Sequence, residues 1–174
     1  MAVLRETVSG YDSFGRLVSI NNDNYTAAYA YNPDGLRVLK SVTENGITIS
    51  TRYSFEGGNI TLELDSAGNQ TAYNAFGGDT IISRKTGVAT YYYIYNGRGD
   101  VVQLTDSTGA VVVTYDYDAF GNLLMATQGD VNPFRYCGEF WDYETKNYYL
   151  RSRYYNPSTG RFTQRDSYLV FCKV

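Results

Sequence analysis

The amino-acid sequence predicts an all-β fold in which tandem antiparallel β-hairpins form a curved sheet or an open β-solenoid. Three observations lead to this prediction: a repeat of about twenty residues, an alternation of apolar and polar side chains, and regularly spaced turn residues. The composition agrees, since 19 tyrosines and 17 glycines stand against 3 prolines and no histidine. Tyrosine favours half-buried pleated surfaces, and glycine supplies tight turns.

The repeat unit is a tyrosine followed by a polar residue, with glycine a few positions further on. Eight units begin at Tyr11, Tyr31, Tyr53, Tyr73, Tyr95, Tyr117, Tyr136 and Tyr155. Successive starts lie 19 to 22 residues apart. The seventh unit is the poorest match because Cys137 replaces the polar residue. A period of this length is typical of arrays in which each unit is one supersecondary element.

Each unit contains two runs with the period of a β-strand. In residues 47–55, the side chains that share one face are Ile47, Ile49, Thr51, Tyr53 and Phe55. Residues 60–65 alternate in the same way, with Ile60, Leu62 and Leu64 on one face, and residues 111–118 do so too. Period two marks a strand with one buried face. No sustained helical stripe occurs, so we expect little or no helix.

Turn residues separate these runs. They are Asp34-Gly35, Asn45-Gly46, Gly57-Gly58, Gly68-Asn69, Gly77-Gly78, Gly97, Gly109 and Gly121-Asn122. Glycine and asparagine tolerate the positive φ of hairpin turns, and most of these signals lie roughly 10–12 residues apart, as in serial antiparallel strands. The sequence therefore predicts a meander of about eight hairpins.

The residues of the repeat have predictable mechanical roles. The Asp or Asn after each tyrosine can accept hydrogen bonds from amides two residues on, and the glycine completes the turn. The tyrosine can bury its ring against the neighbouring hairpin and keep its hydroxyl at a polar edge. Tyrosines one repeat apart would form an aromatic ladder across strands.

Charge and hydropathy exclude several classes of function. The net charge of −3 and pI near 4.9 argue against a nucleic-acid partner, because a basic surface captures the phosphate backbone. No apolar run approaches the ~20 residues of a membrane span. The N-terminus lacks the apolar core of a signal peptide.

Catalytic motifs are also missing. Without histidine, no Ser/His/Asp or Cys/His nucleophile system can form. Neither phosphate-binding glycine motif, GxxxxGKS/T or GxGxxG, is present. Cys137 and Cys172 are too few for a disulfide framework and lack metal-ligand neighbours, and residues 57–59 and 65–69 match no calcium-loop pattern. We expect no enzyme activity, no cofactor and no metal.

Two segments resemble a known family. Residues 11–17 read YDSFGRL and look like the YD-repeat signature. Residues 132–166 read NPFRYCGEFWDYETKNYYLRSRYYNPSTGRFTQRD and resemble the RHS-repeat-associated core domain almost throughout. The chain thus resembles the C-terminal part of an RHS/YD-repeat protein. The resemblance divides it into a hairpin array (1–131), a core or capping motif (132–166) and a C-terminal tail (167–174).

The resemblance implies a structural role. Members of this family wind YD hairpins into a hollow shell around a variable C-terminal polypeptide, often a toxin, and the core motif plugs or finishes the shell. We therefore expect a scaffold segment of a secreted or cell-surface protein that encloses or presents a C-terminal effector. Its partners would be the rest of the shell or that effector. The location would be extracellular, as part of a larger protein.

The resemblance also identifies candidate residues of the motif. They are Tyr148, Tyr149, Arg153, Tyr155, Asn156, Pro157, Gly160, Arg161, Phe162 and Asp166. The arginines of this segment, Arg151, Arg153, Arg161 and Arg165, could form an anion site, or they could bind neighbouring loops and stack on tyrosines. Residues 141–166, which contain the only tryptophan, are the expected cap of the array. The N-terminal strand edge would be open and could support self-association.

Two alternative functions remain open. In some family members, core aspartates form an aspartyl self-protease, which needs two carboxylates that share a proton. Here Asn156 stands where those members have aspartate, so Asp166 is only a relic candidate, or a turn carboxylate paired with Arg153 or Arg161. The second alternative is a carbohydrate- or protein-binding module that uses exposed tyrosines. Tyr92 is its candidate, because alternation places it on the face opposite Tyr91 and Tyr93.

Overall fold

The structure is a computed structural model that describes residues 7–164, and this part of the chain is all-β apart from one short 3₁₀ turn, η1 (Tyr136–Gly138). The strands are β1 (Val8–Tyr11), β2 (Leu17–Asn21), β3 (Tyr25–Tyr31), β4 (Arg37–Glu44), β5 (Ile47–Glu56), β6 (Asn59–Leu64), β7 (Gln70–Gly77), β8 (Thr80–Thr86), β9 (Thr90–Tyr95), β10 (Val101–Thr105), β11 (Val111–Tyr117), β12 (Leu123–Ala126), β13 (Phe140–Asp142), β14 (Asn147–Leu150), β15 (Arg153–Asn156) and β16 (Arg161–Phe162). Among these residues no helix is long and apolar enough to cross a membrane.

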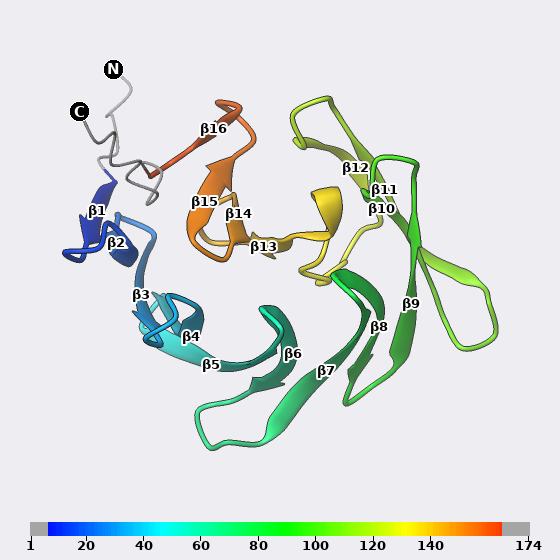
Figure 1. Ribbon diagram of the computed structural model, residues 1–174, viewed down its shortest axis with the longest axis horizontal. Coiled ribbons are helices and arrows are strands. Elements are labelled where there is room, and N and C mark those ends of the chain that lie inside the picture. Colours follow the sequence, from blue (N-terminus) through cyan, green and yellow to red (C-terminus); the bar gives the residue numbers. More distant parts are fainter. Residues whose placement is uncertain (1–6, 165–174) are drawn as a thin grey trace, which may run out of the picture.

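The strands form two antiparallel sheets. Strands β1 to β12 pair strictly with their neighbours in sequence, so they make one twelve-stranded meander. Strands β13 to β16 make a second sheet in the same serial order. Figure 1 shows that the first sheet, called the curved sheet below, bends into an open arc. The predicted all-β fold of tandem hairpins in a curved sheet is confirmed.

The polar residue after the repeat tyrosine builds the hairpin turn in the first and sixth units, as predicted, but Ser54 and Asn74 lie inside β5 and β7 and build no turn. Asp12 Oδ1 accepts hydrogen bonds from the amides of Phe14 and Arg16, both at 2.9 Å. Asp118 Oδ1 does the same for the amides of Phe120 and Asn122, at 2.8 and 2.9 Å. These bonds satisfy turn amides that the sheet leaves unpaired.

The repeat tyrosines tie each hairpin to the one before it. The Tyr31 hydroxyl donates to the carbonyl of Leu17 at 2.7 Å, and the Tyr95 hydroxyl donates to the carbonyl of Ile81. Both bonds reach fourteen residues back along the chain. The ring can therefore pack on the preceding hairpin while the hydroxyl keeps a polar partner. The predicted role of the repeat tyrosine is confirmed at these two positions.

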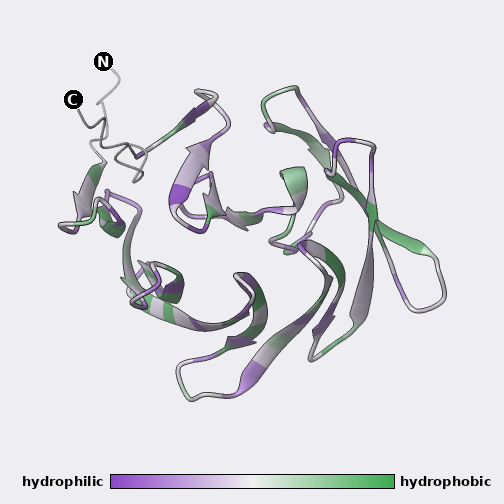
Figure 2. Cartoon of the chain, viewed as in Figure 1, coloured by the Kyte–Doolittle hydropathy of each residue, from purple (hydrophilic) through white to green (hydrophobic). Residues whose placement is uncertain are grey.

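The second sheet and the loop before it lie inside the arc (Figure 1). We call residues 132–164 the closing motif. Its Phe140, Tyr149 and Tyr154 share one apolar core with Leu17 and Leu104 of the curved sheet. Figure 2 shows apolar and polar residues following one another along the strands, as expected when one face of a sheet is covered.

The last two repeat units do not extend the array. Tyr136 lies in η1 and Tyr155 lies in β15, so six hairpins rather than about eight form the curved sheet. In the seventh unit Cys137 supplies no turn acceptor and takes a left-handed φ of 52°. The chain turns back there, and the closing motif fills the arc instead of capping its end. The expected end cap is thus corrected as far as residue 164.

The predicted buried face is wrong on two strands. Ile47 and Ile49 are exposed, each at 68%, although Tyr53 on the same face of β5 is buried. In β6 the register pairs Glu63 with the buried residues Tyr53 and Ala72, so Glu63 faces inward. A register shift between Ser54 and Phe55 changes which side chains of β5 and β6 face the same side of the sheet.

Candidate functional site: the inner interface

The inner interface, where the closing motif meets the curved sheet, is centred on Arg37. This residue begins β4 and its side chain is fully buried. It lies six residues after a repeat tyrosine, a position held in other units by Leu17 and Val101, which are buried apolar residues. A cation therefore occupies an inward position that the repeat otherwise fills with an aliphatic side chain.

Aromatic rings from both sheets surround the Arg37 guanidinium. Those of the closing motif are Tyr149 at 4.2 Å from the ring centroid, with Phe140 and Tyr154 both at 5.7 Å. Those of the curved sheet are Tyr53 at 5.3 Å and Tyr29 at 5.5 Å. A desolvated cation over aromatic faces is held by about 2 kcal/mol or more. The guanidinium thus binds the two sheets together.

Asp142, the last residue of β13, neutralises this cation. Both terminal nitrogens of Arg37 donate to its carboxylate, and Lys40 Nζ donates to Oδ1 at 2.9 Å. Burial raises the pKa of Asp142, but the charges of Arg37 and Lys40 outweigh this and hold the pKa below its ordinary value. Bidentate pairs of this kind fix orientation as well as charge. The motif is therefore locked in one register against β4.

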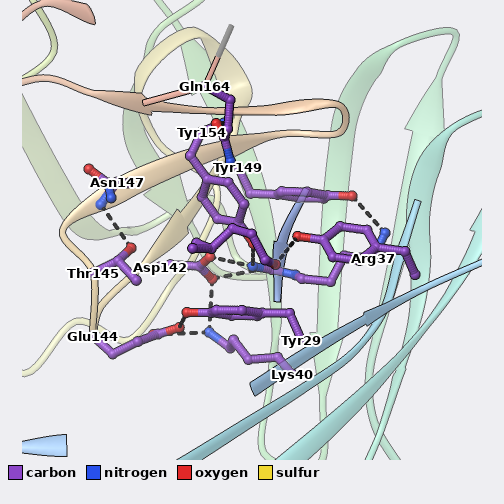
Figure 3. A network of polar contacts seen from close by, with 12 residues as sticks. Tyr29, Arg37, Lys40, Asp142, Glu144, Thr145, Asn147, Tyr149, Tyr154 and Gln164 are labelled. Atoms are coloured by element: carbon purple, nitrogen blue, oxygen red, sulfur yellow. Dashed lines mark hydrogen bonds and ion pairs between the residues drawn. The ribbon is translucent and has the colours of Figure 1, made fainter. Parts of the chain in front are cut away.

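Glu144 extends the network beyond β13. Its carboxylate accepts hydrogen bonds from Lys40 Nζ at 3.2 Å and from the Tyr29 hydroxyl at 3.3 Å (Figure 3). Burial, and then repulsion by Asp142, raise the pKa of Glu144. Two cations, Arg37 and Lys40, thus face two carboxylates in the network, so the formal charges balance. Balanced charge is what a buried ionic network requires.

Two tyrosines of the closing motif also accept hydrogen bonds from Arg37. The Tyr149 hydroxyl accepts the Arg37 backbone N–H at 2.7 Å. The Tyr154 hydroxyl accepts a bond from Nη1 of the same residue at 2.8 Å. Burial raises the pKa of Tyr149 to about 12. Burial also holds the pKa of Tyr154 well above its ordinary value, so both hydroxyls remain protonated at neutral pH (Figure 3). The buried Nε of Arg37 has no hydrogen-bond partner among the described residues.

A second contact region holds the other end of the arc. Three tyrosine hydroxyls of the motif donate to three consecutive carbonyls in the turn after β11. Tyr136 donates to Ala119 at 3.0 Å, Tyr155 to Phe120 at 2.9 Å and Tyr148 to Gly121 at 3.1 Å. Gly121 has a φ of +87°, and a Cβ there would lie 2.5 Å from the Tyr136 ring. The close approach needs glycine at this turn.

Further arginines spread the interface along the arc. The Arg135 guanidinium lies 5.4 Å from the ring centroid of Tyr115 in β11, and it donates to Asp130, in the loop after β12, at 2.9 Å. Arg151 donates from Nε to the Gly58 carbonyl at 3.0 Å, in the turn after β5. Contacts therefore run from the second hairpin to the sixth, and the motif is attached along the sheet rather than at one point.

The residues predicted for the motif fall into two groups. Tyr148, Tyr149 and Tyr155 lie at the inner interface, as described above. Pro157 joins them, because its carbonyl accepts the Asn122 side-chain amide at 3.1 Å. The φ of Gly160 is +65°, and a Cβ there would come within 3.1 Å of the Phe120 ring.

The other predicted residues lie away from that interface. Arg153 stacks on Phe162 at 3.8 Å from the ring centroid, and Arg161 is exposed on β16. Asn156 Oδ1 accepts bonds from the Ser158 hydroxyl at 2.6 Å and the Thr159 amide at 3.1 Å, so it shapes a turn. Asp166 and its expected arginine pairing lie outside the described residues.

Tyr92, the predicted ligand contact, lies on the outer face of β9. It is 41% exposed, whereas its neighbour Tyr93 faces inward and is buried. The structure therefore places Tyr92 on the face of the curved sheet opposite the inner interface.

Sequence reasoning missed Arg37, Lys40 and Asp142. The signal was present, because Arg37 follows its repeat tyrosine by the same six residues as the apolar Leu17. A charged residue at an inward-facing repeat position needs a buried partner of opposite charge. Among residues 7–164, no group of His, Cys, Asp and Glu could hold a metal ion.

A curved sheet of YD hairpins with a closing motif fastened to its inner face defines a segment of a β-shell protein. The sequence profile of the Teneurin YD-shell family matches residues 76–174, which is more than half of the chain. The chain therefore belongs to the YD-shell family. Its resemblance to RHS/YD-repeat proteins is confirmed.

Several toxins and nucleases contain a similar segment. The tRNA nuclease WapA of Bacillus subtilis (strain 168) is 34% identical over 159 residues, covering 89% of this chain and 7% of that protein. Double-stranded DNA deaminase toxin A of Burkholderia cenocepacia is 23% identical, covering 90% and 13%. The toxin protein Tse5 of Pseudomonas aeruginosa is also 23% identical, covering 90% and 15%. The chain thus spans a small part of the length of these relatives.

Solved structures share the fold. The crystal structure of TcdB2-TccC3 matches with a TM-score of 0.73 and 21% identity, covering 92% of this chain and 9% of that chain. The crystal structure of TcdB2-TccC3 without its hypervariable C-terminal region gives a TM-score of 0.74, also at 21% identity. The arc and the closing motif therefore recur together in a much larger chain.

Proposed function

We propose that this chain is a non-catalytic shell segment that encloses or presents a C-terminal effector in an RHS-type secreted or surface protein. The observation that carries the proposal is the buried Arg37–Asp142 pair, which fastens the closing motif inside the arc. A motif held in this way covers the inner face of the curved sheet. The polypeptide that follows the motif would then begin on the enclosed side.

The relatives support a structural rather than a catalytic role. The same segment matches a tRNA nuclease and a double-stranded DNA deaminase toxin, whose reactions differ. A segment common to both is better explained as the shared carrier than as the source of either activity. The effector, and the extracellular location that follows from it, belong to the proposal for the whole protein.

The chemistry of the inner interface agrees with this role. Asp142 and Glu144 are paired with Lys40, and Asp142 also with Arg37, so their charges stabilise packing. Asn156, at the position where an aspartyl protease would need a carboxylate, uses its side chain in a turn. Neither arrangement supplies the proton-sharing carboxylate pair of an acid protease.

The test is protection of the downstream polypeptide in the full-length protein that contains this chain. The intact protein is treated with protease, and survival of the C-terminal polypeptide is followed by mass spectrometry. We expect protection in the natural sequence and faster digestion after Arg37→Met. Arg52→Met, on the exposed face of β5, is the matched control and should leave protection unchanged. Equal digestion of the C-terminal polypeptide with and without the shell would contradict enclosure.

A binding module is the second candidate, favoured by the exposure of Tyr92 on the outer face. Aromatic faces at a protein surface suit sugar rings or a partner's side chains. A glycan array probed with the intact chain should then give a signal that Tyr92→Ala removes and Tyr29→Phe keeps. If the chain binds no glycan on a broad array, the carbohydrate-binding role is contradicted.

A further inference from the structure

We propose that an aromatic pocket on the closing motif binds a small quaternary ammonium ion as a free molecule. The pocket has a volume of about 210 Å³. Four aromatic rings, a thiol and a carboxylate line it, and they belong to Tyr136, Tyr148, Tyr155, Phe162, Cys137 and Glu139. The site is separate from the Arg37 network and does not depend on the proposed shell function.

Three of these rings form a row across the second sheet. Tyr148 of β14 pairs with Tyr155 of β15, and Tyr155 pairs with Phe162 of β16, so the three side chains share one face. Tyr136 of η1 stands beside the row, with its ring centroid 5.9 Å from that of Tyr148 and its ring inclined by 46°. The rings of Tyr155 and Phe162 are inclined by 67°. The rings therefore form walls at angles to one another rather than one flat surface.

The hydroxyl protons of the three tyrosines are already donated within the protein. Tyr136, Tyr148 and Tyr155 give them to consecutive carbonyls of the turn after β11, as described above. These bonds fix the rings and leave aromatic surface as the wall of the pocket. The Cys137 thiol is engaged too, because it donates to Asp100 Oδ1 at 3.6 Å. The pocket therefore suits a ligand that needs no hydrogen-bond donor from the protein, which argues against a sugar.

Two carboxylates adjoin the pocket. Glu139 lines it, and Asp100 is buried behind Cys137, whose amide it accepts at 3.1 Å. Their cation partners, Arg98 for Asp100 and Arg151 for Glu139, are 59% and 38% exposed, so water screens their charge. Burial, then Asp100 and Glu139, raise the pKa of the Cys137 thiol to about 11, so the thiol stays neutral. Aromatic faces beside carboxylates are the surroundings that bind a quaternary ammonium ion.

The open end of the row already holds one organic cation. The Arg153 guanidinium lies 3.8 Å from the centroid of the Phe162 ring. Arg153 does not line the pocket, and Phe162 remains 42% exposed, so ring surface is left for a second cation. A quaternary ammonium ion, unlike a guanidinium, has no N–H group that needs an acceptor.

An NMR titration of the intact chain with choline tests the site. The control ligand is the neutral isostere of choline, in which a tert-butyl group replaces the trimethylammonium group. We expect the rings to shift the methyl protons of choline upfield, and choline to bind on the order of tenfold more tightly than its isostere. Equal affinities for the two compounds, or no saturable binding of choline, would overturn the proposal.

Two variants test the lining residues. Glu139→Gln keeps the shape of the pocket and removes its charge, so it should weaken the binding of choline and leave that of the isostere unchanged. Phe162→Leu removes one ring and should weaken the binding of choline roughly fivefold. Phe14→Leu, which removes a ring that is 76% exposed on the first hairpin, is the matched control. Urea unfolding shows that each variant is folded, and equal affinities of the two leucine variants would contradict the site.

A vesicle experiment distinguishes a free ion from a lipid headgroup. Phosphatidylcholine vesicles display the same trimethylammonium group, but the closing motif that carries the pocket lies inside the arc (Figure 1). We therefore expect the chain not to sediment with these vesicles. Sedimentation with the vesicles that added choline prevents would overturn the assignment to a free ion.

Discussion

Arg37 and Asp142 are 105 residues apart in the sequence, yet they form a bidentate ion pair with both side chains fully buried. Arg37 begins β4, the second strand of the second hairpin of the curved sheet, and Asp142 ends the first strand of the closing motif. The pair therefore spans the inner interface, and the stability of that interface should depend on it.

Removal of the cation should destabilise the protein strongly. Arg37→Met leaves Asp142 buried with only Lys40 as its cation, and breaking a buried pair costs about 3 kcal/mol or more. Urea unfolding followed by the fluorescence of Trp141 measures the change. Arg52→Met is the control and should lower the free energy of unfolding little. A loss as small as the control's would show that the pair does not hold the motif.

Joint replacement of the pair should recover part of that loss. The double variant Arg37→Met with Asp142→Leu removes both charges from the interior, and apolar replacement of a buried pair is often neutral. We expect the double variant to be more stable than Arg37→Met alone by the same urea measurement. Its remaining deficit would come from Lys40, which loses one of its two carboxylate partners. A double variant less stable than the single one would contradict this account.

Stability should fall in acid partly through Asp142. Its pKa is lowered in the folded protein, so the unfolded chain binds the proton first as the pH falls. The contribution is therefore complete above the ordinary carboxyl pKa of about 3.9 and is lost as the pH falls through the lowered value. Urea midpoints between neutral pH and pH 3 should fall more steeply for the natural chain than for Asp142→Asn. Parallel pH profiles would exclude Asp142 as a source of acid sensitivity.

The turn after β11 should require glycine for two reasons. Gly121→Ala places a Cβ 2.5 Å from the Tyr136 ring and also forces a side chain at a φ of +87°. Gly109→Ala is the matched control, because its φ is +84° and a Cβ there meets nothing within 4 Å. Overpacking adds about 1–3 kcal/mol, so Gly121→Ala should be less stable than Gly109→Ala by that amount in thermal unfolding. Equal losses would mean that the ring simply moves aside.

The tyrosine hydroxyls of the motif should contribute measurably. Tyr148→Phe deletes the bond from a buried hydroxyl to the Gly121 carbonyl and should cost about 1 kcal/mol in unfolding free energy. Tyr92→Phe, on the outer face, removes the same atom and should change stability little. If the two variants lose the same amount, the hydroxyl contact with the turn adds nothing specific.

Much of the fold was predictable from local signals. The Asp12 and Asp118 turns, the repeat tyrosines and the strands between them followed from residues within a few positions of one another. The strand faces were less predictable, because a register shift turned Glu63 inward and because the motif does not cover Ile49. A bulge moves every later side chain to the other face, and the repeat pattern alone does not locate it.

The candidate site was predictable only in part. Tyr148, Tyr149 and Tyr155 came from the resemblance, and they do contact the curved sheet. Their partners in the curved sheet could not be predicted in this way, because Arg37 and the turn at Gly121 belong to hairpins far away in the sequence. Which hairpin meets which motif residue depends on the curvature that the whole array accumulates.

The sequence by itself determined the hairpin, its turn chemistry and the family of the closing motif, because period-two alternation and Asx–Gly turns act over a few residues. Only the tertiary structure decided that the motif folds into the arc and that Arg37 meets Asp142 there. A buried cation constrains where its carboxylate must be, but not which of the 18 acidic residues supplies it. That choice is made when the sheet curves and brings together two residues that lie 105 positions apart in the sequence.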